Sequence, residues 1–263
     1  MKPIGVFDSG VGGLTVVAAL RRQLPHESFI YLGDTARLPY GTKSAATVTR
    51  YTRRNVAFLQ DRGVKAIVVA CNTASALALD SLDVDVPVWG VIEPGAAQAA
   101  HSSRGRIGVV ATQSTVGSGA YEAALLAHRP DLVVLSKACP LFVPLVEEGW
   151  YDDPVTEEIA QRYLEPMTDA RVDTLVLGCT HYPLLAAVLQ RIVGPDVTLV
   201  DSAESVALAV RRGLEQRDLL ARQETPEHHL CITDSAERFR ELAVRILGSE
   251  AASLELVELP VTD

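Results

Sequence analysis

Features of membrane and exported proteins are absent from this sequence. Its 263 residues contain no run of about 18 apolar residues, the length that a membrane-spanning helix needs. The start, MKPIGVFDSG, lacks the basic segment and long apolar core of a secretory signal. We therefore expect a cytoplasmic protein that does not bind membranes.

Basic residues are also few. Lys and Arg number 24 against 33 Asp and Glu, and the formal net charge is -9. Because nucleic-acid surfaces rely on clustered Lys and Arg, we expect no direct binding of nucleic acid.

The length of the chain suits one large domain, or two of roughly 100 to 150 residues, with a core that needs no disulfides.

Cysteine is scarce, and its spacing excludes common uses. Cys71, Cys139, Cys179 and Cys231 form no CxxC pair, and no His lies at ligand spacing beside a second Cys. We therefore predict no metal site. In a cytosolic protein, free thiols are expected rather than disulfides. Cys139 and Cys231 are interpreted as packed core thiols.

The glycine-rich turn at residues 10–13 lacks the features of a nucleotide site. It follows a strand-like run, but it has neither the third spaced glycine of a dinucleotide fingerprint nor the Gly-Lys-Ser/Thr of a P-loop. Close approach of the backbone to a substrate is the favoured interpretation.

Strand-like runs alternate with helical patterns along the chain. Helix signals include the stretch from Ser44 to Gly63, the Asp153-Pro154 pair, and Ser235 before a helical pattern. This alternation predicts an α/β fold with mostly parallel sheets. The strands are predicted at 4–7, 29–32, 66–70, 86–91, 107–110, 132–135, 174–177, 198–200 and 230–232.

One short pattern occurs twice. Residues 65–75, KAIVVACNTAS, and 173–183, DTLVLGCTHYP, are each an apolar run that ends at a cysteine before a helix-forming stretch. An Ile-Gly-Val strand begins 67 positions before Cys71 (71 minus 4) and 72 before Cys179 (179 minus 107). Two similar α/β units, each with one cysteine, are predicted. We expect the helix after each strand to lower the pKa of its thiol.

Two cysteines on two related units suit a racemase. Such an enzyme removes a proton from one face of a stereocentre and returns one to the other face, which requires one thiolate and one thiol. Asp8 and His181 are the predicted assistants of the two thiols. No Lys lies in these turns to anchor a pyridoxal-type cofactor, so we predict no cofactor and expect preorganised donors to stabilise the carbanion.

The sequence resembles the glutamate racemases of the cofactor-independent aspartate/glutamate racemase family. CNTAS together with GCTHYP is highly specific, and Pro-Tyr-Gly at 39–41 favours glutamate over aspartate. The matching segments span most of the chain in the expected order: GVFDSGVGGLTV at 5–16, YLGDTARLPYGTKS at 31–44, VVACNTASALAL at 68–79, VIEPG at 91–95, GVVATQSTVGSGAYE at 108–122, CPLFVPLVEEG at 139–149, LVLGCTHYPLL at 175–185 and VDSAESVA at 200–207.

The resemblance implies roles for individual residues. Cys71 and Cys179 match the catalytic thiols, the first serving the proton of the D-enantiomer and the second that of the L-enantiomer, and Asp8 and His181 match their helpers. Asp34 and Arg37 are interpreted as ion-paired scaffolding outside the site. The implied substrate-binding residues are Asp8, Ser9, Tyr40, Gly41, Asn72, Thr73, Thr180, His181, Glu147, Thr112 and Thr115.

The resemblance also implies the architecture and the biological role. Two similar doubly wound, mostly parallel-sheet domains, related by pseudo-two-fold symmetry, hold the active site between them. The first domain is expected at residues 1–96 plus 207–263 and the second at 97–206. The implied function is interconversion of L- and D-glutamate, which supplies D-glutamate for peptidoglycan synthesis. The sequence itself does not give the oligomeric state, but dimers are frequent in the family, which is consistent with a homodimer.

Three alternatives remain open at this point. In the first alternative, the protein is a racemase whose substrate is aspartate or another acidic amino acid. The second is action on a protein partner such as DNA gyrase with catalysis secondary, although both cysteines are intact. The third is a thiol oxidoreductase or cysteine hydrolase, which is disfavoured because the two thiols lie 108 positions apart (179 minus 71).

Overall fold

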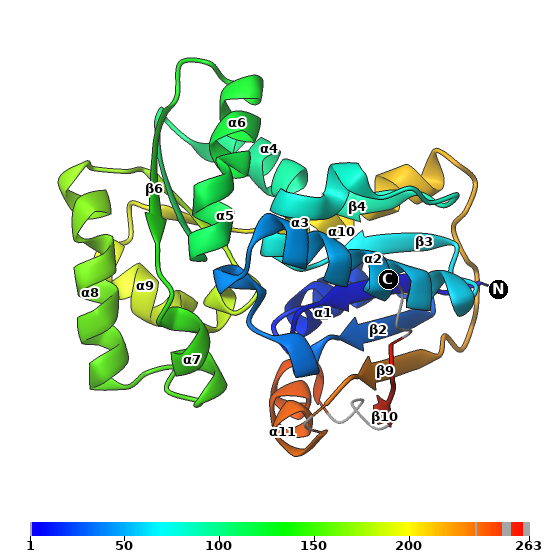
Figure 1. The fold of residues 1–263 in the computed structure, drawn as a ribbon. Helices are drawn as coiled ribbons and strands as arrows, with labels where there is room; N and C mark the ends of the chain where they lie inside the picture. The colour runs from blue at the N-terminus through cyan, green and yellow to red at the C-terminus, as the bar shows by residue number, and fades with distance from the viewer. Residues whose placement is uncertain (1, 235, 249–253, 260–263) are drawn as a thin grey trace.

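The computed structural model describes residues 2–234, 236–248 and 254–259. Within these ranges the strands form a six-stranded and a four-stranded sheet, and the pairings in both are parallel (Figure 1). The predicted α/β fold with two parallel sheets is therefore confirmed. None of the helices in the described ranges has the length and apolar content that a membrane crossing requires.

The two sheets define two lobes. The first lobe holds, in spatial order, β10 (Leu254–Leu256), β9 (His228–Ile232), β2 (Phe29–Gly33), β1 (Ile4–Asp8), β3 (Ala66–Val69) and β4 (Val88–Gly90). The second lobe holds β6 (Val133–Ala138), β5 (Arg106–Ala111), β7 (Thr174–Gly178) and β8 (Thr198–Asp201). β10 is the strand that the sequence did not predict.

Helices lie on both faces of the sheets (Figure 1). Short 3-10 helices occur at Thr35–Arg37, Tyr40–Thr42, Leu79–Ser81 and Tyr182–Leu185. The α-helices are α1 (Leu14–Gln23), α2 (Ala45–Asp61), α3 (Asn72–Ala78), α4 (Ile92–Ser102), α5 (Gln113–Ser118), α6 (Ala120–His128), α7 (Phe142–Glu147), α8 (Pro154–Asp169), α9 (Ala186–Val193), α10 (Ser202–Glu215) and α11 (Ala236–Leu247).

The repeated sequence pattern becomes a repeated topology. The order β2-β1-β3-β4 in the first lobe matches β6-β5-β7-β8 in the second. In each lobe the Ile-Gly-Val strand pairs with the strand that leads to a cysteine, so Ile4 lies opposite Ala66 and Ile107 opposite Thr174. Both cysteines therefore leave corresponding strands at the carboxyl edge of their sheets.

Local sequence explains the burial of two central strands and the starts of two helices. Strands β1 and β7 are buried along their whole length, as expected for apolar runs in a parallel sheet covered on both faces. Ser44 caps α2 by accepting from Thr47 N–H, and Asp153 caps α8 with Pro154 in its first turn. The third predicted cap, Ser235, lies outside the described residues.

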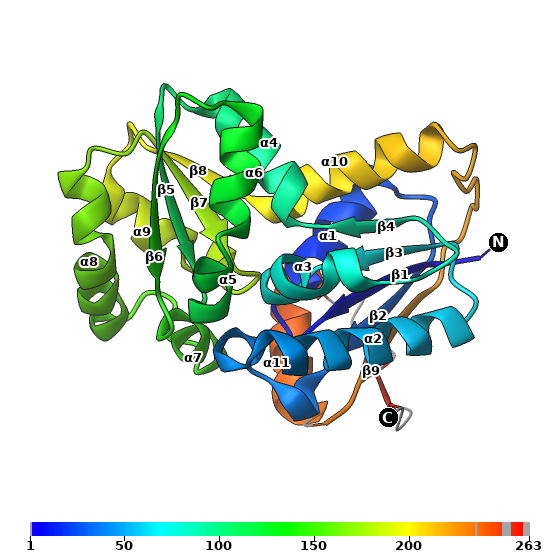
Figure 2. The ribbon, with the colours of Figure 1, turned by 45° about the horizontal axis from the view of Figure 1, so that its top comes forward.

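Two helices cross between the lobes. α4 follows β4 but packs against α6, β7 and β8, and its alanines join the core of the second lobe. α10 follows β8 but packs on α1 and β4, in the core of the first lobe (Figure 2). The predicted domain boundaries at 96 and 207 fall inside these two helices and stay predictions.

Candidate active site

The two cysteines of the repeated pattern occupy matching positions in the two lobes. Cys71 comes after β3 and caps α3, and its sulfur accepts from Ala74 N–H at 3.5 Å. Cys179 follows β7 directly, and each cysteine is 5% exposed. This is the edge where open α/β sheets bind ligands.

A single small cavity between the lobes contains both thiols. Its volume is about 20 Å³, room for about one water molecule, whereas ligand pockets usually measure roughly 300 to 1,000 Å³. An amino acid therefore enters only if the walls move apart. The cavity is lined by Ser9, Gly10, Leu38, Pro39, Tyr40, Gly41, Cys71, Asn72, Thr73, Thr112, Val143, Glu147, Cys179, Thr180 and His181.

All the predicted site residues line this cavity except Asp8 and Thr115. The Asp8 carboxylate is fully buried one layer behind, where Oδ2 accepts from the backbone N–H of Gly10 and of Gly13, each at 3.0 Å. Its Oδ1 accepts from the Thr180 hydroxyl at 3.3 Å. Asp8 thus ties the glycine-rich turn of the first lobe to the cysteine loop of the second, and its roles as a helper of a thiol and as a substrate-binding residue stay predictions.

Thr115 belongs to a hydroxyl cluster that joins the lobes. Its Oγ1 lies 3.1 Å from that of Thr73 and 2.9 Å from that of Thr112, while the Thr73 and Thr112 oxygens are 2.9 Å apart. Thr73 and Thr112 line the cavity, whereas Thr115 supports them from behind.

The hydroxyl of Tyr40 forms hydrogen bonds with two buried residues of the first lobe. It donates to Asp34 Oδ2 at 2.5 Å and accepts from Asn55 Nδ2 at 3.0 Å. Arg37 pairs with the same Asp34 carboxylate at 2.7 Å, as its predicted scaffolding role requires. Tyr40 and Gly41 line the cavity, while the Tyr40 hydroxyl is hydrogen-bonded to two residues of the first lobe.

His181 sits between Cys179 and Glu147. Its Nδ1 lies 3.9 Å from the Cys179 sulfur, and its Nε2 lies 3.3 Å from Glu147 Oε1. Burial acts to lower the pKa of His181, but the contacts with Cys179 and Glu147 outweigh it and raise that pKa to about 10. At neutral pH the imidazole is a cation, a neighbour that favours a thiolate.

The expected lowering of the Cys71 pKa is wrong for this structure. Burial and the nearby Asp8 carboxylate raise the pKa of Cys71 to about 12. The opposing contacts, with Ala74 N–H and the Ser9 hydroxyl 3.7 Å away, are too weak to reverse this. The thiol is desolvated, and one turn of a seven-residue helix does not offset that loss.

The helix expected after Cys179 also differs. Pro183 opens a 3-10 helix, Tyr182–Leu185, and α9 begins only at Ala186. The positive group beside Cys179 is therefore the His181 side chain and not an α-helix N-terminus.

Three lining residues were not predicted: Leu38, Pro39 and Val143. Gly10, which also lines the cavity, belongs to the turn whose backbone was expected to approach a substrate. Gly10 and Pro39 stand directly beside predicted residues in the sequence. Val143 lies one helical turn before Glu147 on α7, a spacing that places both on one face. That spacing was the available signal for Val143 in the cavity wall.

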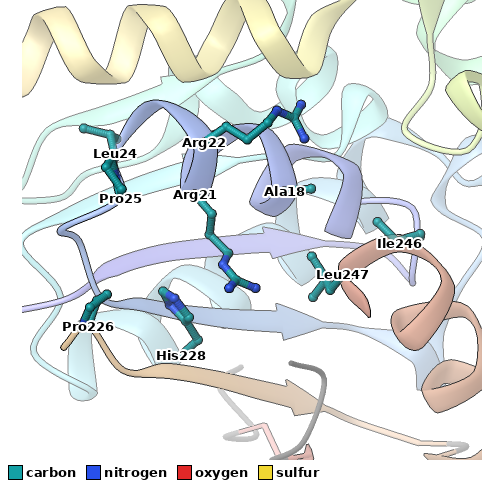
Figure 3. Close-up of a pocket in the computed structure, with 9 residues that line it drawn as sticks. All are labelled: Ala18, Arg21, Arg22, Leu24, Pro25, Pro226, His228, Ile246 and Leu247. Atoms are coloured by element: carbon teal, nitrogen blue, oxygen red, sulfur yellow. The ribbon is translucent and has the colours of Figure 1, made fainter. Parts of the chain in front are cut away.

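A larger open groove of about 410 Å³ lies near the amino ends of β2 and β9 (Figure 3). Its lining includes Arg21, Arg22 and His228, and Arg22 is ion-paired with Glu204. It contains none of the predicted site residues, and we exclude it as the active site. Within the described ranges, no three His, Cys, Asp or Glu side chains gather as metal ligands do.

Gly12 allows the lobes to approach each other at the site. A Cβ there would lie 2.5 Å from Thr180 Oγ1 and 2.6 Å from His181 Nδ1. We expect Gly12→Ala to reduce kcat/KM on the order of 100-fold, because both side chains must shift. The control is Gly117→Ala on α5, where a Cβ meets no described atom within 4 Å and activity should be unchanged. Equal activities of the two variants, measured with glutamate, would contradict this account.

Comparisons with known proteins agree with this geometry. Residues 10–210 match the family model described as Asp/Glu/Hydantoin racemase. The chain is 49% identical over 261 residues to the glutamate racemase of Chlorobaculum parvum, covering 97% of this chain and 96% of that protein. It is also similar to the crystal structure of glutamate racemase isoform RacE1 from Bacillus anthracis, with a TM-score of 0.96, 42% identity and 99% of each chain covered. The glutamate racemase of Francisella tularensis, solved in complex with D-glutamate, has a TM-score of 0.93 and 39% identity over 99% of each chain. The chain belongs to the Asp/Glu/hydantoin racemase family.

Proposed function

We propose that this protein is a glutamate racemase that interconverts L- and D-glutamate with two cysteines and without a cofactor. The observation that carries the proposal is the pair of thiols, Cys71 and Cys179, which leave matching strands of two lobes and line one cavity. The relatives named as glutamate racemases support the reaction, and the D-glutamate bound to the Francisella protein supports the substrate.

The proposed reaction removes the α-proton from one face of the α-carbon and delivers a proton to the opposite face. With L-glutamate, the Cys179 thiolate takes the α-proton, so that an S–H bond forms as the C–H bond breaks. The Cys71 thiol then gives its proton to the opposite face of the carbanion and becomes the thiolate. With D-glutamate the same steps run in reverse, and each cycle exchanges the protonation states of the two sulfurs.

The two thiols have unequal surroundings. The imidazolium of His181 stands beside Cys179, while burial keeps Cys71 protonated by raising its pKa to about 12. This difference suits Cys71 to the role of proton donor when L-glutamate is the substrate.

Polar groups on the cavity wall fit an acidic amino acid. Hydroxyls of Ser9, Thr73 and Thr180 and the amide of Asn72 line it, and such donors suit carboxylates better than an apolar slot does. Held in place, they also stabilise the charge that develops when the α-proton leaves. Leu38 and Val143 help to exclude water when the lobes close.

The unequal surroundings predict unequal alkylation of the cysteines. At neutral pH, iodoacetamide should modify Cys179 faster than Cys71, because burial keeps the Cys71 thiol protonated and the thiolate is the reactive species. Cys231, which is buried with its pKa raised to about 11, is the internal reference and should react slowly. Peptide mass spectrometry over time gives the three rates, and faster reaction at Cys71 than at Cys179 would contradict the assignment.

Circular dichroism of L-glutamate tests the function itself. Purified protein without added cofactor or metal should bring the signal of L-glutamate to zero, and D-glutamate should decay to the same end point. L-aspartate under the same conditions should change far more slowly. An unchanged L-glutamate signal, or faster loss of the aspartate signal, would contradict the proposed substrate.

The setting of the reaction completes the proposal. We place the enzyme in the cytoplasm, where its D-glutamate supplies peptidoglycan synthesis, and we expect a homodimer. Light scattering coupled to size-exclusion chromatography tests the dimer by its mass, twice the 28.3 kDa of one chain.

A further inference from the structure

The side-chain amide of Asn72 carries a buried donor at the cavity. Its Oδ1 accepts from the Tyr121 hydroxyl at 2.7 Å. Its Nδ2 is buried and has no hydrogen-bond partner among the described residues. Because an unpaired buried donor destabilises a folded protein, and because Asn72 lines the cavity, this N–H group points to a ligand acceptor there.

Tyr121 reaches Asn72 from the other lobe. Tyr121 lies on α6 of the second lobe, whereas Asn72 is the first residue of α3 in the first lobe. The ring is almost fully buried, and burial raises the pKa of Tyr121, so its hydroxyl keeps its proton and can donate. The hydrogen bond therefore depends on the closed arrangement of the lobes.

Ser202 lies near the Tyr121 hydroxyl, beside Gly95. The hydroxyl donates to Asn72 Oδ1, and burial keeps it protonated by raising the pKa of Tyr121. Gly95 allows the approach, since a Cβ there would be only 3.3 Å from Ser202 Cβ and 3.5 Å from the Tyr121 hydroxyl oxygen. An inverted Asn72 amide would instead present its oxygen to the cavity and repel a carboxylate.

We propose that Tyr121 is a positioning residue for substrate recognition. Its hydroxyl holds the Asn72 amide with Nδ2 toward the cavity, so that a substrate carboxylate meets this donor only when the lobes are closed. The inference rests on the proposed function, because it takes a carboxylate as the group that Nδ2 binds.

Tyr121→Phe removes the hydroxyl and keeps the ring. We expect KM for glutamate to rise about tenfold with kcat within about twofold of wild type, since a bond made equally before and during reaction affects binding alone. The matched control is Tyr182→Phe, another fully buried tyrosine, whose hydroxyl donates to the backbone oxygen of Cys139 at 2.8 Å. Its KM should match the wild type although its melting temperature falls by a similar amount.

A double-mutant cycle with Asn72 separates positioning from packing. If Tyr121 acts through Asn72, adding Tyr121→Phe to Asn72→Ala should cause no further loss of kcat/KM. If the two substitutions together lower kcat/KM by the product of their separate effects, the inference is overturned. An unchanged KM in Tyr121→Phe, or an equal rise of KM in Tyr182→Phe, would overturn it as well. A wild-type protein that does not racemise glutamate overturns the proposed function and this inference together, whereas an active wild type with an unaffected Tyr121→Phe overturns the inference alone.

Discussion

Cys71→Ala and Cys179→Ala should each lower the rate of glutamate racemisation by about 10³-fold or more, because one face of the α-carbon then has no acid or base. The loss of kcat/KM must be the same from either enantiomer, since the equilibrium constant of racemisation is one. Each variant should remain folded, because removing one sulfur from a cavity wall leaves the two cores intact. Polarimetry or circular dichroism with each enantiomer measures the loss.

The surviving thiol should still exchange the α-proton of one enantiomer. In D₂O, Cys71→Ala should introduce deuterium into L-glutamate without inverting it, and Cys179→Ala should do the same with D-glutamate. Cys231→Ala is the control, because Cys231 lies in the core of the first lobe and should be dispensable. Full racemisation by either single variant, or exchange of the same enantiomer by both, would contradict the assignment of faces.

His181→Gln should reduce kcat/KM on the order of 100-fold in both directions, the range that a proton-transfer assistant contributes. The variant loses the imidazolium of His181, whose Nδ1 lies 3.9 Å from the Cys179 sulfur. Its activity should therefore peak at higher pH than that of the wild type. The control is His229→Gln on β9, an exposed histidine whose loss should leave activity unchanged.

The same variant tests the raised pKa of His181 through stability. The folded-state pKa of about 10 lies above the ordinary value of 6.5, so the stabilisation by the charged form is complete below about pH 6.5 and is lost as pH rises through 10. The difference in melting temperature between wild type and His181→Gln should shrink across that range. A difference that grows with pH would show that His181 is neutral in the folded protein.

Much of the fold was visible in the sequence because its buried strands are continuous apolar runs. The runs before Cys71 and Cys179 gave two related parallel sheets, which the structure confirms. Strand β10 was missed because three residues carry too little pattern. Composition and periodicity did not predict the packing of α4 and α10, since an amphipathic helix does not specify which of two sheets its apolar face will cover. The boundaries at 96 and 207 came from the family resemblance alone and stay predictions.

The sequence predicted which residues line the cavity, but it did not predict their hydrogen-bond partners or their pKa shifts. Asp8 ends its strand as predicted, yet only the fold shows that its carboxylate is used by Gly10, Gly13 and Thr180. Tyr121 lies within a segment that resembles the family, but its bond to Asn72 crosses the lobes and has no local signature. The Cys71 pKa depends on burial, which spacing does not report.

Tracing where hydrogen enters the product tests the central claim most directly. Wild-type protein should be given each enantiomer in D₂O and stopped after a small fraction of turnover, and the separated enantiomers analysed by mass spectrometry. If two sulfurs act from opposite sides, the newly formed enantiomer carries one deuterium from solvent while the unreacted substrate stays unlabelled. Product that retains the original α-hydrogen would mean that one group both removes and returns the proton, which would contradict the account.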